Sequence, residues 1–139
     1  MKLRQKIIII IFVLLSAGGC ARIMEPFRVM WGSSTRALEK ARGQAISKTY
    51  PCEFNACFDA ALEIVKERKY VLFVNERSNK RLVVMGIPGN VDTTEVGIFF
   101  HELKKSEVWI DISSLSSTAK ERVAKAVFDE LDKKFKEQK

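Results

Sequence analysis

The sequence is poor in the residues that most often carry chemistry. It has one histidine, His101, and three cysteines among 139 residues. A structural zinc site usually takes four His or Cys ligands, so we expect no metal site. The sequence also lacks a G-x-S-x-G nucleophile motif, a P-loop and a G-x-G-x-x-G dinucleotide motif. We therefore predict that the protein has no catalytic residues, is not an enzyme and needs no cofactor.

The sequence also lacks an apolar run long enough to cross a membrane. Its longest run, residues 7–15, is well short of the roughly 20 residues that a spanning helix needs. Three basic residues precede this run within the first six positions, and small residues at 16–19 follow it. A positive start, a short apolar run and a small-residue site are typical of a secretory signal peptide.

The end of this segment, Ser16-Ala17-Gly18-Gly19-Cys20, resembles the lipobox of bacterial lipoproteins. The resemblance implies cleavage before Cys20 and lipid on Cys20, such as palmitate-containing acyl chains. Ala17 departs from the family pattern, which usually has Leu there. Ala21 stands where Asp would resemble an inner-membrane retention signal, which implies the outer membrane, facing the periplasm. Ordinary secretion with cleavage near Gly19 and an uncleaved anchor are the alternatives.

The net charge of +7 gives little information about partners. Lys2, Arg4 and Lys6 contribute part of it and belong to the signal segment. The remaining basic residues are mixed with Glu and Asp, as on an ordinary solvated surface. We predict attachment to a membrane through the lipid on Cys20 and no nucleic-acid partner.

Cys52 and Cys57 are the two other cysteines, five positions apart. A disulfide is compatible with an oxidising compartment. Within one regular helix this spacing exceeds the usual disulfide reach, so a bridge requires Cys52 to lie outside the helix. Pro51 favours a helix entry at this point. A Cys52–Cys57 disulfide and two small buried thiols are both open interpretations.

Periodicity predicts the elements after the signal segment. We expect a tether at residues 21–33, which either docks on the domain or lies at the bilayer interface. A short helix at residues 33–46 and a connector at residues 47–51 follow it. A helix at 52–68 and a helix at 117–136, with a Thr118–Glu121 capping box, flank four strands. The strands are expected at 70–74, 81–87, 93–102 and 107–113.

The short turns between these strands predict an antiparallel meander. The fold class is therefore α+β, a two-layer sandwich of order α-β-β-β-β-α with both long helices on one face of a four-stranded sheet. We expect three regions: the signal peptide at 1–19, the lipidated cysteine, tether and short helix at 20–49, and a compact domain at 50–139.

The alternation of the last two strands predicts their two faces. Aliphatic and aromatic residues should face the helices: Val96, Ile98, Phe100, Val108, Ile110 and Ile112. The opposite face carries Phe99, His101 and Trp109 among polar residues. These three residues form a candidate interaction patch, unless residues 23–31 fold back and cover them. His101 and Asp111 share this face, but no nucleophile is predicted beside them.

The order of lipobox, tether and one α+β domain resembles small uncharacterised bacterial lipoproteins, as does the segment WGSSTRALEKAR at residues 31–42. The α-β-β-β-β-α order is loosely similar to the helix-grip domains of the outer-membrane assembly lipoprotein BamC. The resemblance implies a cell-envelope lipoprotein but transfers no functional residues. We expect a non-catalytic protein-interaction or structural module with an envelope protein partner. The alternative is a binding module for a lipid, peptidoglycan or another envelope ligand.

Overall fold

The computed structural model describes residues 35–136. From Arg36 onward these residues belong to one compact unit. The predicted signal peptide, Cys20 and the tether at 21–33 lie outside the described residues, as does the prediction that residues 23–31 cover the patch.

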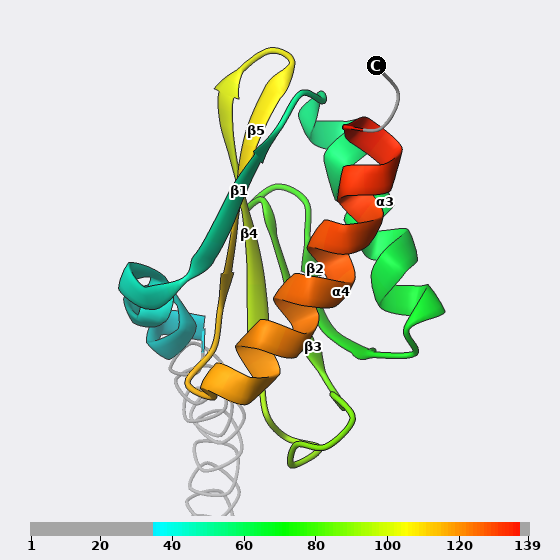
Figure 1. Cartoon of the computed structure of the whole chain (residues 1–139). Helices are drawn as coiled ribbons and strands as arrows, with labels where there is room; N and C mark the ends of the chain where they lie inside the picture. Colours follow the sequence, from blue (N-terminus) through cyan, green and yellow to red (C-terminus); the bar gives the residue numbers. More distant parts are fainter. Residues whose placement is uncertain (1–34, 137–139) are drawn as a thin grey trace, which may run out of the picture. The chain divides into compact units, whose positions relative to one another are not determined.

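A five-stranded antiparallel sheet forms the centre of the domain (Figure 1). The sheet order is β1-β5-β4-β3-β2. Its strands are β1 (Ile46–Tyr50), β2 (Val71–Glu76), β3 (Arg81–Met85), β4 (Val96–Lys104) and β5 (Glu107–Ser113). The α+β class is as predicted, and β2 to β5 correspond to the four predicted strands.

The prediction of a four-stranded sheet was wrong, because residues 46–50 form a fifth strand rather than a helix end and a connector. β1 pairs antiparallel with β5 from Ile46↔Ile112 to Tyr50↔Val108. Lys48 lies between Ile46 and Tyr50 on the inward face of β1. Because this middle inward residue is charged, the sequence does not show the apolar alternation that is typical of a strand. The Lys48 Nζ atom lies 2.7 Å from Asp132 Oδ2, so the inward charge has a partner.

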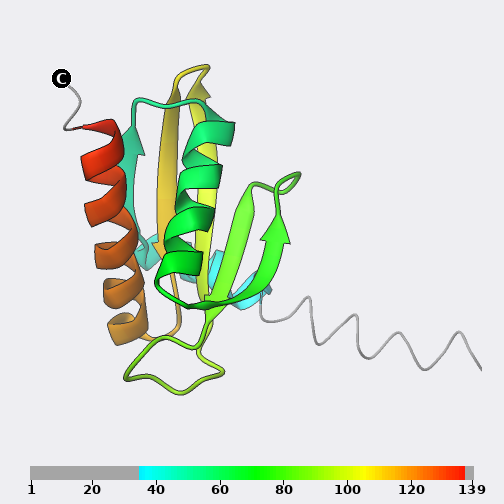
Figure 2. The same cartoon turned by 90° about the vertical axis from the view of Figure 1, so that its right-hand side faces the viewer.

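Two long helices, α3 (Phe54–Glu67) and α4 (Ser117–Phe135), pack on one face of the sheet (Figures 1 and 2). Their apolar stripes meet the inward strand residues in one hydrophobic cluster. The six strand residues predicted to face the helices all belong to this cluster and are buried. Burial of this apolar surface supplies the main favourable contribution to folding.

The start of α4 differs from the predicted capping box. Ser116, not Thr118, is the N-cap residue, and its Oγ atom accepts a hydrogen bond from the Ala119 backbone N–H at 3.3 Å. A residue that caps a helix must have an extended backbone, and Ser116 has a φ of −99° and a ψ of 115°. Several hydroxyl residues precede this helix, and the sequence pattern alone did not distinguish among them.

The opposite face of the sheet is partly covered by the start of the described chain. Residues 35–40 are helical and continue into the 3-10 helix η1 (Ala41–Gln44), which lies across the sheet from α3 and α4 (Figure 1). Leu38 packs against Val83 and Phe99 in a second, small cluster. The sheet therefore has apolar contacts on both faces.

Gly97 makes this second cluster possible. A Cβ atom at this position would lie 2.9 Å from Phe99 Cζ, too close for a real contact, and 3.5 Å from Leu38 Cδ1. The absent side chain leaves room for the Phe99 ring to lie flat over β4 beneath Leu38. Phe99 is only 4% exposed as a result.

Candidate functional site

A polar network centred on Asp111 lies on the sheet face opposite α3 and α4. Asp111 is on β5 and is 8% exposed. Its Oδ1 atom accepts a hydrogen bond from Ser47 Oγ at 2.7 Å, and its Oδ2 atom accepts one from Arg42 Nη2 at 2.9 Å. Trp109 Nε1–H also donates to Oδ1. Three donors from η1, β1 and β5 thus converge on one nearly buried carboxylate.

The pKa of Asp111 reflects two opposing effects. Burial by itself raises the pKa, because it penalises the charged form. Hydrogen bonds from Ser47, Arg42 and Trp109 stabilise the carboxylate and lower the pKa below its ordinary value. Asp111 is therefore ionised at neutral pH and acts as the fixed acceptor of the network.

His101 lies beside this network but does not form a catalytic arrangement with it. Burial and the charge of Arg42 lower the pKa of His101, although Asp111 opposes them, so the imidazole is neutral at pH 7. Arg42 Nη2 contacts His101 Nε2, which must be the acceptor because a guanidinium only donates.

Ser47 donates directly to Asp111, whereas in a serine hydrolase the histidine lies between the serine and the aspartate. Here the histidine does not lie between Ser47 and Asp111, so this arrangement does not activate Ser47 as a nucleophile.

The structure divides the predicted interaction patch. Trp109 and His101 are register partners on β5 and β4, and Trp109 is 40% exposed. Phe99 is buried instead of exposed, because Leu38 packs on it and the guanidinium carbon of Arg42 lies 4.8 Å from the centre of its ring. The patch therefore consists of Trp109 and its neighbours, without Phe99.

Sequence reasoning missed Arg42 and Ser47 as members of this site. The sequence predicts Arg42 to lie within a short helix and Ser47 within a connector, with no role for either. The alternation of residues 46–50 places Ser47 and Thr49 on the same sheet face as Asp111 and is a signal that could have identified Ser47. No local pattern indicates that Arg42 reaches residues 59 and 69 positions further along the chain.

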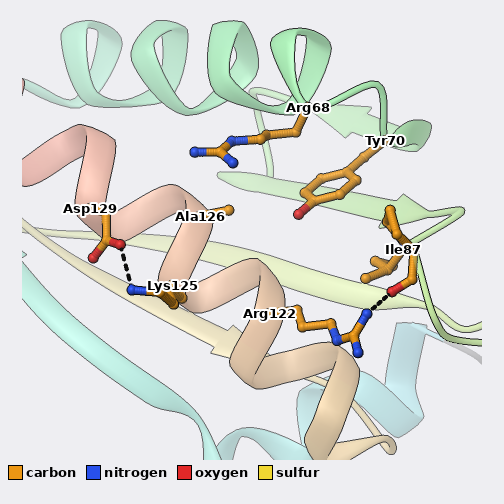
Figure 3. Close-up of a pocket in the computed structure, with 8 residues that line it drawn as sticks. Arg68, Tyr70, Ile87, Arg122, Lys125, Ala126 and Asp129 are labelled. Carbon is orange, nitrogen blue, oxygen red and sulfur yellow. Dashed lines mark hydrogen bonds and ion pairs between the residues drawn. The ribbon is translucent and has the colours of Figure 1, made fainter.

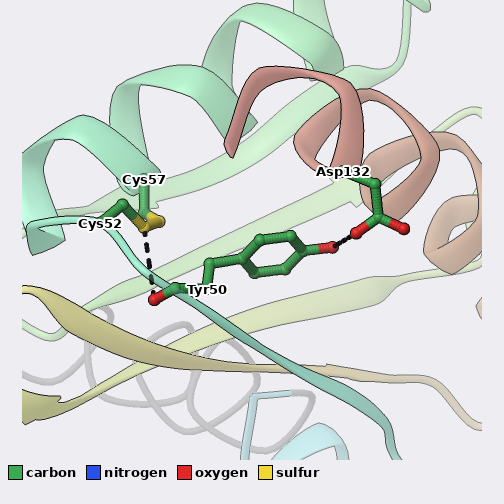
Figure 4. The surroundings of a disulfide bond; sticks show 4 residues. All are labelled: Tyr50, Cys52, Cys57 and Asp132. Atoms are coloured by element: carbon green, nitrogen blue, oxygen red, sulfur yellow. Dashed lines mark hydrogen bonds between the residues drawn. A yellow bond between two sulfur atoms is a disulfide. The ribbon is translucent and has the colours of Figure 1, made fainter. Parts of the chain in front are cut away.

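Cys52 and Cys57 are joined by a disulfide at the entry to α3 (Figure 4). Their Cα atoms are 6.0 Å apart, within the usual range. Cys52 precedes Glu53, the N-cap residue of α3, and so lies outside the helix.

The Tyr50 carbonyl oxygen lies 3.9 Å from Cys52 Sγ, and the buried Tyr50 ring extends toward α4, where its hydroxyl donates to Asp132 Oδ1 at 2.9 Å (Figure 4). Burial and the contact with Asp132 raise the pKa of Tyr50, which stays protonated. The disulfide and this hydrogen bond connect the end of β1 to both long helices.

Residues 35–136 contain no group of three or more His, Cys, Asp and Glu side chains suited to a metal ion. None of the helices in that part of the chain has the length and apolar character needed to cross a membrane. No protein-family model matches the chain, and no curated protein matches it.

Proposed function

We propose that the protein is a lipid-anchored bacterial cell-envelope protein, held at the outer membrane through Cys20, whose domain is a non-catalytic module that binds a protein partner at Trp109. The anchor rests on the signal segment that ends at Cys20. The binding surface rests on one observation: Trp109 is exposed and its indole is held in place by the Asp111 network.

A rigid exposed tryptophan has the properties of a protein-binding anchor. Tryptophan is enriched among residues that dominate binding energy, and a side chain that is already ordered loses little entropy on binding. Trp109 lines neither of the two hollows described for this domain, and it lies on a sheet surface beside Thr49 and His101. An exposed aromatic residue outside a hollow suits a protein surface better than a small ligand.

The partner surface is tested by crosslinking in intact cells. A photoreactive residue at position 49, opposite Trp109 in the β1–β5 register, should crosslink a partner. Trp109→Ser should abolish that crosslink, and a cooperative thermal melt should show that the variant is still folded. Val91→Ser, which alters a side chain that is 73% exposed on the β3–β4 loop, should keep it. A Trp109→Ser variant with an undiminished crosslink would show that this surface is not the contact.

The anchor is tested by metabolic labelling with a palmitate analogue. Cys20→Ala should remove the label and either release the protein from the membrane fraction or leave an uncleaved precursor. The matched control Cys52→Ala/Cys57→Ala should keep the label, since the proposed lipid is on Cys20 alone. A mature wild-type protein without label would refute the lipid anchor.

A further inference from the structure

We propose that a hollow between the end of α3, the β3–β4 loop and α4 binds a phosphate-bearing anion. The hollow has a volume of about 430 Å³, which falls within the range of small-molecule sites. It lies on the helix-covered side of the domain and shares no residue with the Asp111 network. The proposal depends neither on the lipid at Cys20 nor on Trp109.

Positive charge dominates the lining of this hollow. Arg68 at the C-terminal end of α3 lines it together with Arg122 and Lys125 of α4, and Asp129 is the one acidic residue in the lining (Figure 3). The floor includes Ile87 and Ala126, which are 1% and 7% exposed. A basic rim over an apolar floor suits an anionic group attached to a less polar body.

The existing partners of these basic side chains leave them available to a ligand. Arg68 Nη2 lies 3.4 Å from Glu130 Oε1, and Lys125 Nζ lies 2.9 Å from Asp129 Oδ2. The side chain of Lys125 is 80% exposed and that of Arg68 is 47% exposed. Exposed ion pairs of this kind contribute little to stability, so an incoming anion can replace the carboxylate partner of Arg68 or Lys125 or bind the same cation beside it.

The position of Arg122 is set by the β3–β4 loop. Arg122 donates through Nη1 to the Pro88 carbonyl oxygen, which uses one of its five N–H donors. Gly89 has a φ of +79°, and a Cβ atom there would lie 2.9 Å from Arg122 Cζ. The glycine therefore lets the guanidinium lie against the loop, and among residues 35–136 the Pro88 carbonyl is the one hydrogen-bond partner of Arg122, which leaves other donors for an anion.

Tyr70 adds a neutral donor to the same hollow. Its ring extends over the space between Arg68 and Ile87, with the hydroxyl directed toward the hollow (Figure 3). Within residues 35–136 this hydroxyl has no hydrogen-bond partner. Two guanidinium groups, an ammonium group and a hydroxyl line the hollow, and together they offer the kinds of donor that bind the acceptor oxygens of a phosphate. Glycerol phosphate has this chemistry, both as a free solute and as part of a phospholipid headgroup.

The test uses the full-length chain in neutral detergent micelles, with NMR observation of the backbone amides of Tyr70 and Gly89. One arm adds soluble glycerol 3-phosphate, and the other adds phosphatidylglycerol to the micelles. Saturable shifts at both amides are expected. Shifts with the soluble probe identify a free phosphate compound as sufficient, whereas shifts with the lipid alone identify a membrane headgroup.

Two double variants separate a defined site from diffuse charge. Arg122→Gln/Lys125→Gln should weaken binding by about tenfold to a hundredfold, because charge-assisted hydrogen bonds are lost. Lys104→Gln/Lys105→Gln changes the net charge equally where β4 meets the β4–β5 turn and should leave the affinity within about twofold. Tyr70→Phe keeps every charge and should weaken binding severalfold. Absence of saturable shifts with both probes, or equal losses in the two double variants, would overturn the proposal.

Discussion

Asp111 is the residue on which the outer face of the sheet depends. It accepts hydrogen bonds from Ser47, Arg42 and Trp109 while nearly buried. Removing its charge would leave Arg42 without its carboxylate and would loosen the indole of Trp109. The same residue thus contributes both to the stability of the domain and to the geometry of the proposed binding surface.

Asp111→Asn should lower the free energy of unfolding by about 1–3 kcal/mol at pH 7, the usual cost of an imperfectly satisfied buried polar group. Urea denaturation measures this change. Asp92→Asn makes the same chemical change at an exposed loop position and should stay within about 0.5 kcal/mol. An Asp111→Asn variant as stable as the control would mean that the network contributes little.

The stability should also depend on pH through this carboxylate. The pKa of Asp111 is lower in the folded state than the unfolded value of about 3.9. The stabilisation is therefore fully present above about pH 4, and it is lost as the pH falls through the lowered folded pKa. Asp132 shifts in the same direction. Urea midpoints across the acid range should fall less steeply for Asp111→Asn than for the wild-type protein.

At the scale of elements, β1 is an edge strand held by contacts beyond its pairing with β5. Lys48 and Tyr50 both bond to Asp132 on α4, and the disulfide joins the chain just after β1 to the first turn of α3. A strand of five residues at a sheet edge has ladder partners on one side only. The side-chain bonds and the disulfide compensate for the missing partner.

Reduction of the Cys52–Cys57 disulfide should lower the free energy of unfolding by about 2 kcal/mol, because a short closed loop restricts the unfolded chain only moderately. Urea melts with and without dithiothreitol measure the difference. The Cys52→Ala/Cys57→Ala variant should show no dependence on the reductant. A wild-type melt insensitive to dithiothreitol, together with two thiols titrating in the unreduced protein, would show that the cysteines are not bridged.

At the scale of the whole described domain, the sheet has two apolar layers of unequal size. The larger cluster lies under α3 and α4, and the smaller one lies under the helical residues 35–40. Leu38 anchors the smaller layer, and its carbonyl accepts a hydrogen bond from Ser113 Oγ at 2.9 Å. The same segment carries Arg42 to Asp111, so this layer also supports the polar network.

Leu38→Ala should therefore lower the free energy of unfolding by about 2–5 kcal/mol, as buried leucine truncations do. Thermal and urea melts measure this effect. Lys40→Ala truncates an exposed side chain two positions further on and should change stability by less than about 0.5 kcal/mol. Equal stability of the two variants would mean that residues 36–44 do not pack on the sheet in solution.

The sequence by itself determined the elements whose pattern is local. The amphipathic stripe of α3, the apolar stripe of α4 and the alternation of β4 and β5 each repeat within a few residues, and the inward faces of β4 and β5 were predicted correctly. The disulfide was left open, because its geometry depends on where the helix begins. His101 and Trp109 were placed on the correct face for the same local reason.

Only the tertiary structure decided what covers that face and what joins the edge of the sheet. β1 has an inward lysine, and its pattern becomes clear only beside β5 and Asp132. Phe99 has the sequence context of an exposed aromatic, yet Leu38, 61 positions earlier, buries it. Arg42 and Ser47 acquire their roles through Asp111, which is 64 or more positions away. Contacts at such separations depend on how the chain closes on itself, which no local periodicity records.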